Sequence, residues 1–393
     1  MLTEKADIGS FDRHADYCYI LHIIMNKSEY TPKTYTKDSI KAIDAKFEAQ
    51  KIAFAPLTFQ AVRALLELGL LKAVSDSGEE GITAEKASEK AGISLYGVKV
   101  LFEIALGMNL IKLLSESGEA RFVLGKTGWF LLEDEMTKVN FNFTNDVCYK
   151  GAFELKRSIE EGKPLGLEVF GHEGKTIYEV LSVLPEKVKE SWFAFDHFYS
   201  DIVFEEAIPI VFSHKPKKII DIGGNTAKWA ICCCRHDPNV DVTIVDLPGQ
   251  TRVAEQKIAQ AGFSDRIKTQ ACNVLDSKSI IPSGADIIWM SQFLDCFSLD
   301  EITMIMKKAH NAAGANTNIY ILEPFWDKQR FEAASFSLQA TSLYFTSMAN
   351  GNSKMYRCEE LAQAVEKAGF DIVDARHNLG SNDYSLLCCR RKM

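Results

Sequence analysis

The chain has 393 residues and a formal net charge of −8, because 53 Asp and Glu side chains outnumber 45 Lys and Arg. This length allows two or three domains, and a composition that is 47% hydrophobic with only ten prolines excludes a largely disordered chain. The acidic balance makes nucleic acid and anionic membranes poor partners, and no run approaches the roughly 18 apolar residues of a membrane span.

Residues 1–125 are expected to form the first domain. Their N-terminus is charged and lacks the apolar core of a signal peptide, so we expect a soluble, cytoplasmic protein. An apolar-rich helix over 57–70 is closed by Gly69, and Thr83 and Ser94 are placed to cap two further helices. The segments 110–114 and 121–124 predict a two-stranded hairpin. This order of helices and hairpin is the outline of a winged helix.

A winged helix can bind DNA, but this one lacks the charge for it. The segment that would be the recognition helix, 94–109, carries one basic residue, Lys99, and one acidic residue, Glu103. Neutralising several phosphates takes several Lys or Arg side chains. A role in packing or in forming a homodimer is therefore the favoured hypothesis, and DNA binding is the alternative.

Residues 126–214 are predicted to be a helical, aromatic-rich region that connects the domains and lines part of a pocket. His197 lies here, ahead of the last domain, where it can reach a pocket or be held by structural hydrogen bonds.

Residues 215–393 alternate strands with helices, which predicts a doubly wound, mostly parallel seven-stranded α/β sheet. Only about a dozen residues separate the last two strands, so a helical crossover does not fit and the final strand is expected to be antiparallel. The expected strands are 218–222, 242–245, 267–271, 286–290, 318–322, 370–373 and 384–389.

The cysteines and histidines of the chain do not predict a metal site. Three cysteines are consecutive (232–234) and two are adjacent (388–389), which is not the spacing of a tetrahedral site, and the eight histidines are scattered. Small buried apolar side chains in a reducing compartment are the expected interpretation.

The predicted ligand site lies where the first two strands of the sheet end. The first strand ends at Asp221 and is followed by Gly223 and Gly224, which allow a sharp turn and a close approach of a ligand. The second strand ends at Asp246, whose carboxylate can accept both hydroxyl hydrogens of a ribose. Together they predict an adenosine-containing ligand.

The phosphate-binding fingerprints G-x-G-x-x-G and G-x-x-x-x-G-K-[ST] are absent from the chain. S-adenosyl-L-methionine has a ribose and an adenine but no phosphate, and its sulfonium cation is compatible with an acidic neighbour such as Asp221. We therefore expect this cofactor, with S-adenosyl-L-homocysteine as its product.

Four segments in this order resemble motifs of the small-molecule O-methyltransferases, a family that includes plant caffeate, hydroxyindole and bacterial polyketide-tailoring enzymes. They are Asp221-Ile-Gly-Gly-Asn-Thr, Val245-Asp-Leu-Pro-Gly, Arg266-Ile-Lys-Thr-Gln-Ala-Cys-Asn-Val and Ile319-Tyr-Ile-Leu-Glu. The resemblance covers roughly residues 50–390 and implies a class I methyltransferase fold with an N-terminal winged-helix dimerisation domain.

The resemblance also implies roles for individual residues. Gly223, Gly224 and Asn225 would wrap the methionine part of the cofactor, and Asp246 would hold its ribose. Leu247 would pack beside the adenine, and Asn273, followed by Val274, would bond the adenine amino group. Ser291 and Gln292 fall at the cofactor-facing end of the fourth strand.

The chain departs from the family pattern at several positions, and one of them is Met355, which stands where the family has a later acid. Ala227 replaces a loop glycine, which is tolerable where φ stays negative. Asp295 stands where the family has its catalytic histidine, while Glu323 keeps the acid that supports that base. An ordinary Asp is about 2.6 pKa units less basic than His, so either burial raises its pKa or the acceptor is already acidic. A helix cap or a surface position is the alternative for Asp295.

Aromatic residues and methionines after the fifth strand predict a hydrophobic acceptor pocket, with core packing as the alternative. The expected pocket residues are His197, Trp326, Tyr344 and Met348. We thus expect an S-adenosylmethionine-dependent O-methyltransferase that acts on a hydroxyl of a small aromatic or polyketide-like molecule. A DNA-binding or ligand-sensing regulator, and a family member with other cofactor chemistry, are the competing hypotheses.

Overall fold

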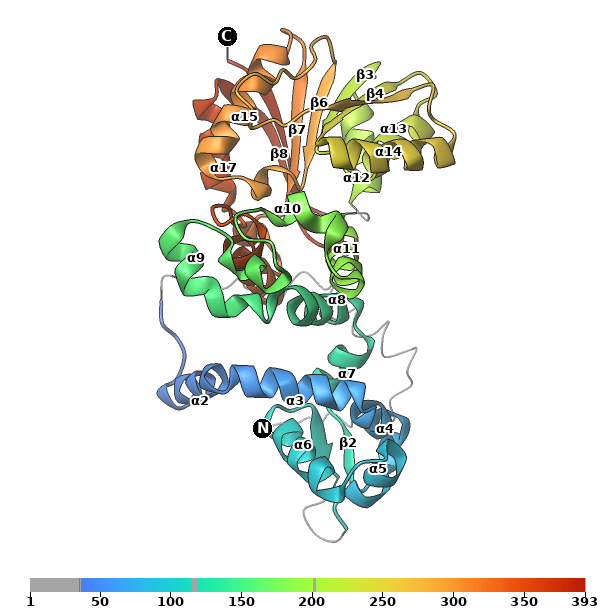
Figure 1. Cartoon of the computed structure of the whole chain (residues 1–393), viewed down its shortest axis with the longest axis vertical. Coiled ribbons are helices and arrows are strands. Elements are labelled where there is room, and N and C mark those ends of the chain that lie inside the picture. Colours follow the sequence, from blue (N-terminus) through green and yellow to red (C-terminus); the bar gives the residue numbers. More distant parts are fainter. Residues whose placement is uncertain (1–34, 36, 115–118, 201–202, 393) are drawn as a thin grey trace, which may run out of the picture.

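The computed structural model describes residues 35, 37–114, 119–200 and 203–392. The N-terminal segment and the tip of the predicted hairpin, over 115–118, lie outside the described residues. Figure 1 shows three parts stacked along the long axis: a small helical part at one end, a helical middle, and a sheet covered by helices at the other end. The predicted boundaries at 125 and 214 stay predictions.

The N-terminal part has the helices and the hairpin that its sequence predicts. Its elements are α2 (Ala42–Ala53), α3 (Ala55–Glu67), α4 (Leu70–Asp76), η1 (Gly78–Glu80), α5 (Ala84–Ala91), α6 (Leu95–Gly107), β1 (Ile111–Leu113) and β2 (Phe122–Leu124). Thr83 caps α5 and Ser94 caps α6, each by accepting a backbone N–H over 3.2 Å. One boundary was wrong: Gly69 adopts a φ of 69° and separates α3 from α4, so Leu70 begins a new helix.

The middle part is helical, and short 3₁₀-helical and π-helical segments connect its α-helices. It comprises α7 (Lys126–Glu133), α8 (Glu135–Phe143), η2 (Thr144–Cys148), η3 (Gly151–Glu154), α9 (Leu155–Glu161), η4 (Leu165–Phe170), α10 (Ile177–Val180), η5 (Leu181–Val183), α11 (Glu186–Ser200) and α12 (Phe204–Phe212). Buried aromatic side chains join it to the last part: Trp192 of α11 donates a hydrogen bond over 2.7 Å to Tyr344, 152 residues further along the chain.

The last part is a seven-stranded sheet with the order β5-β4-β3-β6-β7-β9-β8. Only β9 is antiparallel to its neighbours, which confirms the mostly parallel sheet with an antiparallel final strand. The strands are β3 (Lys218–Ile222), β4 (Asp241–Asp246), β5 (Ile267–Ala271), β6 (Ile287–Ser291), β7 (Asn318–Glu323), β8 (Phe370–Leu379) and β9 (Tyr384–Arg391).

Helices bury both faces of this sheet. They are α13 (Lys228–His236), α14 (Pro248–Ala261), α15 (Leu299–Ala312) and α17 (Cys358–Lys367), together with α12. The helix α16 (Glu332–Tyr344) and the turn η8 (Phe345–Ala349) pack with the helical middle part instead. Two further short turns are η6 (Leu294–Cys296) and η7 (Trp326–Lys328). One core holds apolar residues of α12, α13 and α14, and the other holds those of α15 and α17. Figure 1 shows these two sets of helices on either side of the strands.

The strand order reverses between β3 and β6, so the loops that follow these strands diverge and leave a crevice at their carboxyl ends. On one face of the sheet, the rings of Trp229 of α13 and Trp289 of β6 stack with their centroids 3.8 Å apart, which joins the helix after β3 to β6. Cys233, Cys234, Cys388 and Cys389 are buried among apolar neighbours. No helix in the described part of the chain is long and apolar enough to cross a membrane.

Candidate functional site

The turn after β3 is built so closely that it needs its glycines. Gly223 has a φ of 77°, and a Cβ there would lie 2.3 Å from the Phe293 ring. A Cβ on Gly224 would lie 2.7 Å from Oδ2 of Asp221. Asn225 and Ala227 also have positive φ values, of 44° and 66°. The condition expected for Ala227, a negative φ, is therefore not met, and its buried methyl group is held in the left-handed region at a cost of roughly 1–2 kcal/mol.

Asp246, which ends β4, is held in place by backbone donors. Its Oδ2 accepts the N–H of Asn225 over 2.9 Å, and its Oδ1 accepts the N–H of Leu247 over 2.7 Å. Burial raises the pKa of Asp246, and these two hydrogen bonds act against the rise. Each carboxylate oxygen keeps a further lone pair, so the group can still accept hydroxyl hydrogens of a ribose.

Two buried oxygens beside the turn, Oδ2 of Asp221 and Oδ1 of Asn225, have no hydrogen-bonding partner within the described residues. Burial, and secondarily the charge of Asp246, raise the pKa of Asp221 to about 8. A buried acid of this kind is stabilised by a cationic ligand that also donates hydrogen bonds. The ammonium group of S-adenosyl-L-methionine can donate to Asn225, which lines the cavity, and the positive charges of the cofactor act on Asp221 behind the turn, so these residues fit the expected cofactor.

Asp295 and Glu323 meet at the turn after β6. Glu323 ends β7, is 1% exposed, and accepts the backbone N–H groups of Phe293 and Leu294 through Oε1 over 3.0 and 2.8 Å. It thereby shapes the loop that carries Asp295. The alternatives for Asp295 are wrong, because Ser298 caps α15 and the Asp295 side chain is only 6% exposed.

Burial raises the pKa of both acids. Burial raises the pKa of Asp295 to about 6, whereas burial and the charge of Asp295 raise the pKa of Glu323 well above its ordinary value. With a pKa of about 6, Asp295 is a carboxylate at neutral pH, so it has the ionisation state of a base and a pKa close to that of His.

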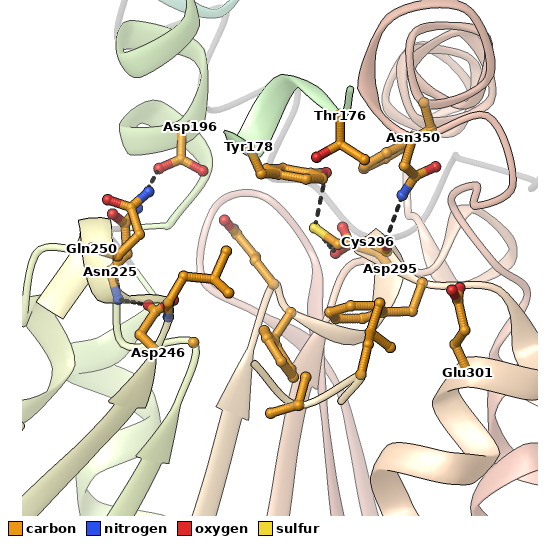
Figure 2. A pocket seen from close by; sticks show the side chains of 18 of the residues that line it. Thr176, Tyr178, Asp196, Asn225, Asp246, Gln250, Asp295, Cys296, Glu301 and Asn350 are labelled. Atoms are coloured by element: carbon orange, nitrogen blue, oxygen red, sulfur yellow. Dashed lines mark hydrogen bonds between the residues drawn. The ribbon is translucent and has the colours of Figure 1, made fainter. Parts of the chain in front are cut away.

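Two residues beside Asp295 were not predicted. The Tyr178 hydroxyl of α10 donates to Sγ of Cys296 over 3.2 Å, and that sulfur lies 3.5 Å from Oδ1 of Asp295. Figure 2 shows Tyr178 reaching across the cavity towards this turn. Cys296 directly follows Asp295 in the sequence, but no pattern marks Tyr178, because it is 118 residues away.

A single cavity of about 530 Å³ joins the two halves of the site. Figure 2 shows Asn225, Asp246 and Gln250 on one side of it and Tyr178, Asp295 and Cys296 on the other. The predicted residues that line this cavity are Gly223, Asn225, Asp246, Leu247, Asn273, Val274, Gln292, Asp295 and Tyr344. Further aromatic lining comes from Trp192, Phe195, Phe293, Phe297, Phe345 and Tyr384.

The other predicted residues lie behind this lining. Asp221, Gly224, Ser291 and Glu323 support the walls from the strand ends. His197 packs beside Phe193 at 5.8 Å between ring centroids, and Trp326 packs edge-on against Tyr35 at 5.6 Å. Met348 is fully buried, and its sulfur fills the space above Gly151 and Gly166. We therefore assign His197, Trp326 and Met348 to packing and not to the pocket wall.

All charged side chains among the described residues of the cavity lining are acidic. Its acidic residues are Glu179, Asp196, Asp246, Asp295 and Glu301, and no Lys, Arg or His belongs to its described residues. Within the described residues, no group of three or more His, Cys, Asp or Glu side chains is arranged to hold a metal ion.

The chain matches two protein-family models. Residues 46–121 match the Dimerisation2-like domain, and residues 154–371 match the O-methyltransferase domain. The chain is 22% identical over 325 residues to the L-tyrosine C(3)-methyltransferase of Streptomyces lavendulae, covering 81% of this chain and 85% of that protein. It is also 22% identical over 318 residues to the demethylspheroidene O-methyltransferase of Cereibacter sphaeroides, covering 80% and 79% of the two chains.

Solved structures share the fold. The mitomycin 7-O-methyltransferase MmcR superposes with a TM-score of 0.64 at 18% identity, covering 89% of this chain and 98% of that one. Human N-acetylserotonin methyltransferase, solved in complex with S-adenosylmethionine, gives a TM-score of 0.61 at 16% identity, covering 92% and 100%.

Proposed function

Because this chain belongs to the O-methyltransferase domain family, we propose that it transfers the methyl group of S-adenosyl-L-methionine to a hydroxyl group of a small, uncharged aromatic molecule. The family depends on this cofactor, and the expected product is S-adenosyl-L-homocysteine. The observation that carries the proposal is the continuous cavity, which joins the glycine turn and Asp246 to an aromatic chamber containing Asp295.

The cofactor, when bound, supplies a methyl group activated by a positively charged sulfur. Asp246 would accept the ribose hydroxyl hydrogens, and Leu247, Asn273 and Val274 would surround the adenine. Asp221 would offset the positive charge from beneath the turn. Holding the acceptor beside the methyl group supplies much of the rate acceleration by proximity.

The charge of the cavity distinguishes between acceptor classes. A carboxylate acceptor would enter a lining with five acidic residues and no basic one among those described, which is unfavourable. A neutral phenol has no such penalty, but its hydroxyl must lose a proton, and Asp295 with a pKa of about 6 is a suitable base. We therefore favour a neutral phenol over an acceptor that is already anionic.

Methyl transfer to a ring carbon is the second candidate, because one relative that aligns over 81% of this chain is named as a C(3)-methyltransferase of L-tyrosine. Deprotonating a phenol activates both its oxygen and its ortho carbon. The carbon-13 chemical shift of the new methyl group separates an O-methyl from a C-methyl product.

The competing hypotheses are weaker. The Nζ atom of Lys99, the one basic residue of α6, lies 3.9 Å from Oε1 of Glu85. This ion pair makes Lys99 less available to bind a DNA phosphate. Cofactor chemistry other than methyl transfer is separated by mass, because methylation adds one CH₂ to the product.

We also propose that the protein is a homodimer formed through its N-terminal part. Residues 46–121 match a dimerisation domain. On α2 and α3, the apolar residues Ile43, Ile52 and Leu57 have exposed fractions between 69% and 75%. Ile52→Glu is expected to lower the mass measured by sedimentation to that of one chain. Ile280→Glu, at an equally exposed position in the last part, is the control.

The function is tested by calorimetric titration with S-adenosyl-L-methionine, followed by incubation of the complex with neutral phenols. Release of S-adenosyl-L-homocysteine together with a methylated phenol supports the proposal. Binding of a nicotinamide dinucleotide in preference to S-adenosyl-L-methionine contradicts it.

A further inference from the structure

Three side chains from two separate parts of the chain form a row along the cavity wall. Tyr178 comes from α10 in the helical middle, whereas Cys296 and Asp295 come from the turn after β6. The Tyr178 oxygen is 3.2 Å from the Cys296 sulfur, which is 3.5 Å from Oδ1 of Asp295. Figure 2 shows the contact between Tyr178 and Cys296 bridging the two parts.

The chemistry of these groups fixes the direction of their hydrogen bonds. An ionised carboxylate can only accept, so the Cys296 thiol donates to Asp295. The sulfur then accepts from the Tyr178 hydroxyl, whose oxygen keeps two lone pairs. Every donor in the row therefore points towards Asp295, and the free accepting position is on Tyr178.

Asp295 is the most buried of the three residues. Asp295 is 6% exposed, while Tyr178 and Cys296 are half-buried, and all three line the cavity. A molecule in the cavity can therefore contact Tyr178, which is the more exposed of the two ends of the row. The Asn350 side chain fixes the Cys296 backbone by donating to its carbonyl oxygen over 2.5 Å.

We propose that Tyr178, Cys296 and Asp295 form a proton relay that deprotonates the acceptor hydroxyl. The inference rests on the proposed function. As the acceptor O–H bond breaks, its proton passes to the Tyr178 oxygen, the Tyr178 proton passes to the Cys296 sulfur, and the thiol proton passes to Oδ1 of Asp295. The electron pair stays on the acceptor oxygen, Tyr178 and Cys296 end as they began, and Asp295 ends protonated until it loses the proton to solvent.

The groups around Asp295 are compatible with this direction. It faces Cys296 on its own turn, Glu323 on β7, Tyr178 on α10 and Tyr356 ahead of α17, none of which carries a positive charge. Burial raises the pKa values of Tyr178 and Cys296 well above their ordinary range, so both stay neutral and pass a proton on. Asp295 is the member of the row that is ionised at neutral pH and can keep the proton.

The relay is tested with two acceptors that differ in acidity, catechol and 4-nitrocatechol. Cys296→Ala and Tyr178→Phe interrupt the row, whereas Cys296→Ser keeps an O–H that can donate and accept. For catechol, the first two variants are expected to lower kcat about a hundredfold and the Ser variant to retain most of it. For 4-nitrocatechol, which ionises without help, all three should stay within about threefold of wild type.

A measurement without turnover uses the colour of the 4-nitrocatechol anion, with S-adenosyl-L-homocysteine in place of the methyl donor. Near pH 6, binding to wild type and to Cys296→Ser is expected to produce the anion band, and binding to Cys296→Ala is not. Equal losses with both acceptors, or a Ser variant as impaired as the Ala variant, would overturn the relay. Wild-type protein that methylates neither probe contradicts the proposed function instead, and the anion band still decides the relay.

Discussion

The backbone N–H of Asn225 donates to Oδ2 of Asp246 over 2.9 Å and so ties the turn after β3 to the end of β4. The side chain of Asn225 extends the tie to α11, where Asp196 accepts from Nδ2 over 3.4 Å. Three elements that are distant in the sequence therefore meet at the cofactor side of the cavity, as Figure 2 shows. Asp246 is at once the expected ribose ligand and the anchor of the turn that would surround the methionine group.

This double role makes Asp246 the most sensitive position for cofactor binding. Asp246→Ala removes a charged acceptor, and one hydrogen bond to a charged group contributes about 1.5–3 kcal/mol. The dissociation constant for S-adenosyl-L-methionine is expected to rise between about tenfold and a hundredfold, measured by titration calorimetry. Asp241→Asn, at the exposed start of the same strand, is the matched control. Unchanged affinity in the Asp246 variant would show that the ribose is held elsewhere.

The ionisation of Asp295 predicts how turnover depends on pH. Its pKa of about 6 means that the carboxylate is present above this pH and is lost to protonation below it. For catechol, kcat/KM is expected to rise through a midpoint near 6 and then level off. Asp295→Asn should abolish this limb together with nearly all activity towards catechol. A profile that is flat between pH 5 and pH 8 would rule Asp295 out as the base.

The strand ends of the site were predictable from sequence because local patterns determine them. The strands 218–222 and 267–271 agree with prediction at both ends, and parallel strands bring their carboxyl ends to one edge. The parallel arrangement therefore predicts that Asp246 at the end of the second strand lies close to Gly223 and Gly224 after the first.

The acceptor side was less predictable, because long-range packing and small changes of helix register decide it. Tyr178 lies on a helix of only four residues, whose position depends on the surrounding helices. Met348 was expected in the pocket wall, but it lies inside η8, a wide π-helical turn whose residues do not keep α-helical spacing. Phe345, the first residue of this turn, lines the cavity, and Met348 packs against Gly151 and Gly166.

Asp221 links cofactor binding to proton release. Its pKa of about 8 in the folded protein, against an ordinary value of 3.8, means that it is protonated at pH 7. A bound cation favours the ionised form, so binding of S-adenosyl-L-methionine at pH 7 is expected to release about one proton. Calorimetry in buffers of different ionisation enthalpy measures this number. Asp221→Asn should bind with no release, and an equal release in this variant would contradict the assignment.

The raised pKa of Asp221 also predicts how the stability of the ligand-free protein depends on pH. Between pH 4 and pH 8 the folded state holds a proton on Asp221 that the unfolded state has lost, so the free energy of unfolding falls as pH rises through this window. Asp221→Asn removes this fall, and the variant is expected to melt at a higher temperature than wild type at pH 8. Identical melting temperatures at pH 8 would show that the buried acid carries no such penalty.

The acidic lining predicts a preference among acceptors of similar shape. Repulsion between two like charges about 6 Å apart at an effective dielectric constant of about 20 amounts to nearly 3 kcal/mol. We expect kcat/KM for 3,4-dihydroxybenzoate to be at least about tenfold below that for 3,4-dihydroxybenzylamine, with catechol between them or close to the amine. A preference for the benzoate would show that the acidic lining does not select against anionic acceptors.

Ala227 offers a test of backbone strain beside the site. It precedes α13 with a φ of 66°, and its methyl group is fully buried. Ala227→Gly relieves roughly 1–2 kcal/mol of strain and loses about 0.8 kcal/mol of methyl burial, so its stability should stay close to wild type. Ala230→Gly, equally buried but inside α13, gains no relief and loses about 1 kcal/mol of helix propensity as well. Urea unfolding should therefore separate the two variants by about 2 kcal/mol, with Ala230→Gly the less stable. Equal destabilisation of both would mean that the turn holds Ala227 without strain.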